Sequence, residues 1–242
     1  MSEHVRLFVG ARVSVPTANA LSGAAETLAR RARDAGADIR WVAPVSYHVT
    51  LGFIGATRPD AIPAIRDALD VATGDAPETI KWRTTRLGAF PSIDKPRVIW
   101  AGIEEQSGEL AALANRVDVE LARIGYGDRS AADRKPFHAH VTIGRVKELP
   151  AKLASLREVV LPLAEQMFGD TRIDAITLFE SETKSTGSVY REVYRAAFKT
   201  GSAEGPESEK RQTGALPLGT PGELTDVERE TDDGWPRGHE PT

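Results

Sequence analysis

The sequence predicts an α+β fold of two similar lobes related by pseudo-two-fold symmetry. A repeat supports this prediction, because the pentapeptide His-Val-Thr-(Leu/Ile)-Gly occurs at 48–52 and again at 140–144. A short apolar run and then a segment with helical spacing precede both copies. The apolar run begins 42 residues before the histidine in the first copy and 43 residues before it in the second. We therefore expect antiparallel-rich sheets that face a central cleft, with helices outside.

The first half of the chain alternates strand and helix signals. The apolar run at 6–13 is typical of a strand. Residues 19–35 have helical spacing, with Gly36 as a stop signal, and their apolar face carries Leu21, Ala25, Leu28 and Ala32. The first pentapeptide follows, then a helix candidate at 59–73 that opens with a proline, and a strand candidate at 81–90.

The second half repeats this order. A β-like run at 97–103 precedes a helical segment at 110–124, which Gly125 ends. After the second pentapeptide, a proline opens a helix candidate at 150–168. Strand candidates follow at 171–180 and, by alternation, at 190–198. Each half thus predicts a strand, a helix, a strand, a helix and a strand.

Composition separates a folded part from a tail. The chain has 242 residues, of which 40% are hydrophobic and 27% charged, as in ordinary globular proteins. From residue 201 it is rich in Gly, Pro and acidic residues without an apolar period. We therefore expect a bilobal domain at 1–200 and a disordered acidic tail at 201–242. The tail carries ten acidic and four basic residues, so the remainder has a net charge of +2, which fits an anionic ligand only weakly.

Several protein classes are excluded or disfavoured. The chain has no cysteine, which excludes disulfides, cysteine-based zinc sites and thiol nucleophiles. We find no signal peptide and no run of about 18 apolar residues, so we expect a cytoplasmic monomer without membrane contact. His138 and His140 form a His-x-His pair, but no third ligand of suitable spacing follows. We expect neither a metal nor a cofactor.

The repeated motif suits paired acid–base chemistry. Because side chains alternate along a strand, the first, third and fifth residues of each motif should share one face, namely His48, Thr50 and Gly52, and His140, Thr142 and Gly144. Two imidazoles with unperturbed pKa values of about 6.5 can divide the roles of base and acid. Threonine hydroxyls can donate hydrogen bonds to oxygens that gain negative charge. These groups suit an in-line displacement at the phosphorus of a strained cyclic phosphodiester, for which no metal is needed.

The paired His-x-Thr motifs, 92 residues apart, resemble those of the two-histidine (2H) phosphoesterase superfamily. The similarity is greatest to its RNA 2′,3′-cyclic phosphodiesterases, also called 2′-5′ RNA ligases. The resemblance spans about residues 4–198. Further matching stretches begin at Arg6, Arg40, Leu87, Pro96 and Arg134.

The resemblance implies a role for each motif residue. His48 would be the proton donor that protonates the departing 3′ oxygen, and His140 the proton acceptor that activates water, which leaves a 2′-phosphomonoester. Thr50 and Thr142 would hold the phosphoryl oxygens. Arg145 matches a basic residue of the family and would neutralise the phosphate. Strict alternation places Arg145 on the face opposite His140, so this role requires a bulge or the end of the strand.

Other features leave alternatives open. The family usually has a lysine or similar polar residue where Gly52 stands, which puts a cationic contact from the first lobe in doubt. Phe90 and Phe137 are candidate substrate-binding residues that could stack on a base, or core and rim aromatics without that role. The expected partners are RNA ends or nucleotides with a 2′,3′-cyclic phosphate, with 2′-5′ ligation as the reverse reaction. The alternatives are a non-catalytic nucleotide- or RNA-binding module, and the same chemistry on 2′-5′ oligoadenylate or a cyclic ADP-ribose phosphate.

Overall fold

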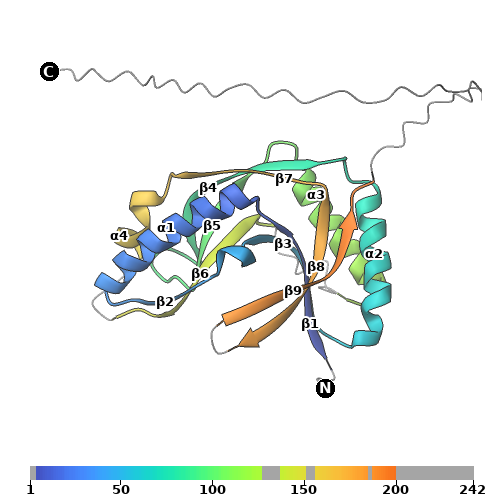
Figure 1. Ribbon diagram of the computed structural model, residues 1–242, viewed down its shortest axis with the longest axis horizontal. Helices are drawn as coiled ribbons and strands as arrows, with labels where there is room; N and C mark the ends of the chain where they lie inside the picture. The colour runs from blue at the N-terminus through green and yellow to red at the C-terminus, as the bar shows by residue number, and fades with distance from the viewer. Residues whose placement is uncertain (1–3, 127–136, 151–155, 185–186, 200–242) are drawn as a thin grey trace, which may run out of the picture. The chain divides into compact units, whose positions relative to one another are not determined.

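A computed structural model describes residues 4–126, 137–150, 156–184 and 187–199, and the expected tail at 201–242 lies outside them. Within these residues nine strands form one antiparallel sheet in the order β7-β4-β5-β6-β3-β1-β8-β9, with β2 paired to β6 (Figure 1). The predicted α+β class and its antiparallel sheet are confirmed. No helix in this part of the chain combines the length and apolarity that crossing a bilayer requires.

The elements follow the predicted order closely. The first half contains β1 (Val5–Arg12), α1 (Val15–Asp34), β2 (Asp38–Trp41), β3 (His48–Thr57), α2 (Ile62–Gly74) and β4 (Ile80–Phe90). The second half contains β5 (Val98–Glu104), α3 (Glu109–Arg123), β6 (His140–Glu148), α4 (Arg157–Val160), β7 (Met167–Ile173), β8 (Ala175–Lys184) and β9 (Gly187–Ala197). Gly36 and Gly125, the predicted stops, have φ angles of 78° and 84°, a left-handed conformation that glycine adopts readily after a helix.

The strand order is symmetric about the seam between β6 and β3. Outward from the seam, one lobe has β6, β5, β4 and β7, and the other has β3, β1, β8 and β9. The last strand of the first half, β4, therefore lies beside β5, and β8 from the second half lies beside β1. The helices are exchanged in the same way, because α1 and α4 pack together on one side and α2 and α3 on the other (Figure 1). Each lobe is thus built from both halves of the sequence.

The helix predicted over 150–168 is wrong for the described part of that range. Only Arg157–Val160 is α-helical, Leu161–Leu163 forms a 3-10 turn, and β7 begins at Met167. Pro162 explains the short helix, because proline offers no backbone N–H and its ring obstructs the preceding turn.

The strand predicted over 171–180 is in fact two strands. Asp174 alone separates β7, at one edge of the sheet, from β8, which lies beyond the seam next to β1. Consecutive Cα atoms are only about 3.8 Å apart, so one residue can join these strands only if the sheet curls strongly. The curl leaves one face of the sheet to the helices and the other to a cleft.

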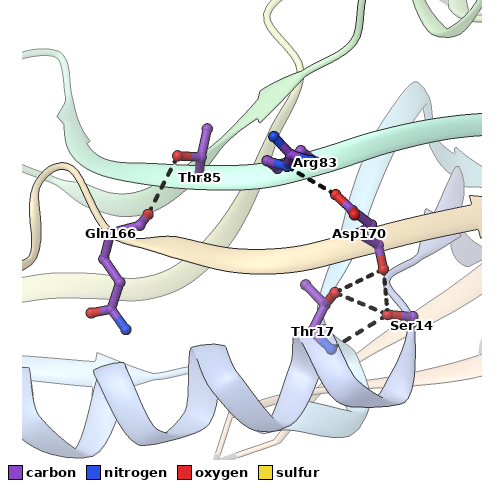
Figure 2. A network of polar contacts seen from close by, with 6 residues as sticks. All are labelled: Ser14, Thr17, Arg83, Thr85, Gln166 and Asp170. Atoms are coloured by element: carbon purple, nitrogen blue, oxygen red, sulfur yellow. Dashed lines mark hydrogen bonds and ion pairs between the residues drawn. The ribbon is translucent and has the colours of Figure 1, made fainter.

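A network of polar contacts joins the start of α1 to β7 (Figure 2). The Ser14 hydroxyl caps α1 by accepting from the Thr17 backbone N–H at 3.4 Å, and it donates to the Asp170 carbonyl at 2.9 Å. The Asp170 carboxylate in turn accepts from Arg83 Nε on β4 at 3.0 Å. These contacts hold α1 to β7, and β7 to β4.

Candidate active site

The two motifs meet at the seam of the sheet. β3 and β6 pair antiparallel with Val49 opposite Val141, and both valines are fully buried on the helix side. Continuing this register places the neighbours of the pair opposite one another on the other face, His48 with Thr142 and Thr50 with His140. All four line a cleft of about 690 Å³. In a regular antiparallel pair, the Cα atoms of diagonal neighbours such as the two histidines lie about 7–8 Å apart. This separation leaves space for one phosphate group between the two rings.

Both imidazoles are held in the same way. Nδ1 of His48 lies 2.7 Å from the Ser46 carbonyl oxygen, and Nδ1 of His140 lies 2.7 Å from the His138 carbonyl oxygen. A carbonyl oxygen only accepts hydrogen bonds, so each Nδ1 must carry the hydrogen and donate it. The nitrogen left for proton transfer is therefore Nε2 in both rings.

The surroundings of both histidines disfavour the charged imidazolium. Burial lowers the pKa of His48 to about 4, against the opposing effect of the hydrogen bond to Ser46; the charges of Arg12, His140 and Arg145 lower it further. The pKa of His140 is also lowered, first by burial and then by nearby positive charge that includes Arg145. At neutral pH the free protein therefore holds both rings neutral.

Aromatic side chains enclose each catalytic candidate. The centroid of the His48 ring lies 4.8 Å from that of Phe8 and 5.3 Å from that of Tyr190, which is perpendicular to it. Phe90 lies 5.1 Å from His140, also nearly perpendicular, and lines the cleft from β4. These rings exclude water from one side of each imidazole, which accounts for the lowered pKa values.

A β-bulge follows the threonine of each motif. The register shifts between Val9 and Gly10 opposite β3, and between Ile99 and Trp100 opposite β6. As a result the two last residues of each pentapeptide are both buried on the helix side, Leu51 with Gly52 and Ile143 with Gly144. The strict alternation predicted for the two glycines is wrong. The next residues, Phe53 and Arg145, face the cleft instead.

The bulge also determines the direction in which a side chain at position 52 would point. A Cβ atom at Gly52 would lie 3.0 Å from Val117 Cγ1 and 3.3 Å from Asp118 Oδ1, both on α3. A side chain at this position would press on α3 rather than reach the cleft. The equivalent of Arg145 in the first motif is therefore Phe53, whose side chain is 75% exposed.

Several cleft residues were not predicted as site residues from the sequence. Arg6 and Phe8 come from β1, and Ser181, Ser188 and Tyr190 come from the β8–β9 hairpin. They flank no motif, and only the crossover between the lobes brings the hairpin to the histidines. The sequence offered two clues: Phe53 follows the first motif as Arg145 follows the second, and Arg6 and Phe8 lie in a stretch that matches the family.

Phe137 lies outside the cleft that contains the two motifs. It is 37% exposed and lines a second hollow of about 510 Å³ together with Trp100 and His138, so the cleft does not include it. Its role in substrate binding stays a prediction. Within the described residues, no group of three or more His, Asp and Glu side chains is placed to hold a metal ion.

Comparison with known proteins agrees with this geometry. The family model "LigT like Phosphoesterase" matches residues 15–100. An RNA 2′,3′-cyclic phosphodiesterase of Aquifex aeolicus is 33% identical over 152 residues, which cover 62% of this chain and 77% of the relative. One from Archaeoglobus fulgidus is 30% identical over 155 residues, which cover 64% and 81%. The chain belongs to the LigT-like phosphoesterases.

Solved structures agree with the fold of this phosphoesterase. A protein of Thermus thermophilus has a TM-score of 0.64 at 25% identity, over 80% of this chain and 97% of that one. The apo form of LigT from E. coli has a TM-score of 0.55 at 21% identity, over 81% and 98%. The family model and the relatives named RNA 2′,3′-cyclic phosphodiesterase confirm the resemblance to the two-histidine phosphoesterases and the expected phosphodiesterase class.

Proposed function

We propose that this phosphoesterase hydrolyses the 2′,3′-cyclic phosphate of RNA ends or nucleotides to a 2′-phosphomonoester. The observation that carries the proposal is the matched pair of imidazoles, each held through Nδ1 and each lining one cleft with Nε2 available. The relatives named RNA 2′,3′-cyclic phosphodiesterase support the substrate class.

Each group then has a defined part in the reaction. As the oxygen of water bonds to phosphorus, the water gives a proton to His140 Nε2. As the bond from phosphorus to O3′ breaks, His48 Nε2 gives its proton to O3′, so one proton leaves His48 and one reaches His140. The hydroxyls of Thr50 and Thr142 donate to the non-bridging oxygens, and Arg145 balances their charge.

The acid role of His48 requires a proton that the free protein does not hold at neutral pH. A phosphodiester carries one negative charge, and an opposite charge close to an imidazole favours its protonated form. We infer that His48 takes up its proton together with the substrate. A well-placed general acid or base contributes about 10²- to 10⁴-fold to the rate.

The test uses adenosine 2′,3′-cyclic phosphate as substrate. His48→Gln and His140→Gln should each lower kcat by about 10²- to 10⁴-fold without altering the far-UV circular dichroism spectrum. The matched control is His138→Gln, which removes a neighbouring imidazole that does not line the cleft. It should keep kcat within about three-fold, because His140 bonds to its backbone carbonyl and not to its ring.

The outcomes separate the alternatives. The product should be the 2′-phosphate, and turnover should survive EDTA. Near-wild-type turnover in either glutamine variant would refute the assignment of the two histidines, and a 3′-phosphate product would refute the proposed orientation of the substrate. Tight nucleotide binding without turnover of any cyclic phosphate would favour the non-catalytic module.

The same groups permit a second reaction of the cyclic phosphate. If the 5′-hydroxyl of a second RNA replaces water, His140 accepts its proton and His48 protonates O3′, which creates a 2′-5′ linkage. We propose this ligation as a secondary activity. A labelled oligonucleotide with a cyclic phosphate end should yield a longer product that a 2′-5′-specific nuclease cleaves, and its absence at high RNA concentration would refute the proposal.

A further inference from the structure

Two arginines face each other across strands β2 and β6. The register pairs Arg40 directly with Arg145, which lines the cleft. The residues on either side of Arg40 pack on the helix side, since Trp41 Cε3 and Ile39 Cγ2 would lie 3.1 Å and 3.2 Å from a Cβ atom at Gly144. Alternation then places Arg40 on the face of Arg145.

The neighbour of Arg40 on that face supports this placement. Val42, two residues further along the chain, lines the cleft. Its backbone N–H donates to the Ile143 carbonyl at 3.0 Å, so the chain after β2 still follows β6. Arg40 therefore lies on the next strand out from Arg145, just beyond the cleft, at the usual strand spacing of about 4.8 Å.

This arrangement is unfavourable without an anion. Like charges directly opposite one another on neighbouring strands destabilise the pair. None of the ion pairs found in the described residues includes Arg40 or Arg145. Asp38, the carboxylate on β2, lies 3.9 Å from Lys147 Nζ instead. Two guanidinium groups on one face, neither of them in an ion pair within the described residues, suit the binding of a phosphate.

We propose that Arg40, with Arg145, binds a second phosphate of the substrate, the 5′-phosphate of the nucleotide that carries the cyclic phosphate. The inference rests on the proposed function and deepens it. Arg145 reaches the reacting phosphate inside the cleft, and Arg40 extends the positive charge outward by one strand. The preferred substrate is then the end of an RNA strand, or a 5′-phosphorylated nucleotide, rather than a nucleoside 2′,3′-cyclic phosphate.

The experiment compares three substrates that differ in the second phosphate. Adenosine 2′,3′-cyclic phosphate lacks it, the 5′-phosphorylated form carries it as a monoester, and ApA with a terminal cyclic phosphate carries it as a diester. A charge-assisted contact makes the wild-type kcat/KM about ten-fold or more higher for the second and third substrates. This advantage should shrink between 50 mM and 200 mM salt.

Arg40→Gln should abolish that advantage while lowering kcat/KM for adenosine 2′,3′-cyclic phosphate less than about two-fold. Arg40→Lys, which keeps the charge, should restore part of it. The matched control is Arg33→Gln, on the exposed surface of α1, which should leave all three substrates unchanged. Thermal unfolding of each variant identifies any loss that arises from folding.

Three results would overturn the inference and leave the proposed function standing. They are equal wild-type kcat/KM for all three substrates, an equal loss for all three in Arg40→Gln, and preference for the dinucleotide without preference for the 5′-phosphorylated nucleotide. The last result would assign the preference to the second base. Absence of turnover of every cyclic phosphate by the wild-type protein would instead refute the proposed function.

Discussion

Acidification should destabilise this phosphoesterase through His48. In the folded protein burial lowers the pKa of His48 from 6.5 to about 4. In the unfolded chain the imidazole is solvated, so between pH 6.5 and pH 4 the unfolded chain binds a proton that the folded protein does not. The free energy of unfolding therefore falls as the pH decreases through this range. At about 1.4 kcal/mol for each pKa unit, the loss approaches about 3 kcal/mol at pH 4.

Urea unfolding at several pH values between 7 and 4.5 measures this effect, with His48→Gln as the comparison. The variant lacks the imidazole, so the stability of the wild-type protein should fall more steeply with acid than that of the variant. A two-dimensional NMR titration of the imidazole resonances should give a midpoint near 4 for His48 in the free protein. Inorganic phosphate should raise this midpoint, because the anion favours the imidazolium.

Two results would refute this reasoning. One is a midpoint for His48 at or above 6.5, and the other is an equal pH dependence of stability in the wild-type protein and the variant. The same shifts affect catalysis, since kcat/KM follows the ionisation of the free enzyme. Both pKa values are lowered in the free enzyme, so the decline of kcat/KM with rising pH should begin below pH 6.5, where the charged imidazole that the acid step requires becomes scarce.

Three further predictions concern the packing of glycines, the cap of α1 and the exposed ring of Phe53. Gly88→Ala should lower the free energy of unfolding, measured by urea titration, by about 1–3 kcal/mol, because a Cβ atom would lie 2.3 Å from Trp100 Cζ2. Gly23→Ala on α1 is the matched control: a Cβ atom there would have no neighbour within 4 Å, so the free energy of unfolding should rise by up to about 1 kcal/mol. Ser14→Ala removes the cap of α1 and should cost about 1 kcal/mol, seen as a lower Tm, and an unchanged Tm would contradict the role of the cap. Phe53→Ala should raise KM for a cyclic nucleotide about ten-fold with little change in kcat, as expected for loss of a stacking ring; an unchanged KM would exclude that contact.

Local patterns predicted the elements whose signals are local. The apolar residues of α1 recur every three or four positions and Gly36 follows the helix, so both signals are visible without knowledge of the fold. The buried valines Val49 and Val141 follow from alternation along single strands. The helix predicted at 150–168 was wrong because the opening proline and the apolar content of that segment are typical of a helix. In the described residues, Pro162 and the start of β7 limit the helix to one turn.

The sequence by itself determined that His48 and His140, each with its threonine, lie on strands of two related halves, because a repeat with alternating burial needs no partner strand to be recognised. Only the tertiary structure decided that Arg145 and Phe53 enter the cleft, and that β8 and β9 enclose His48. The bulges arise from pairing with β5 and β1, and the crossover at Asp174 joins strands on opposite sides of the seam. Such pairings join residues that are distant in the chain, so no pattern within a single strand encodes them.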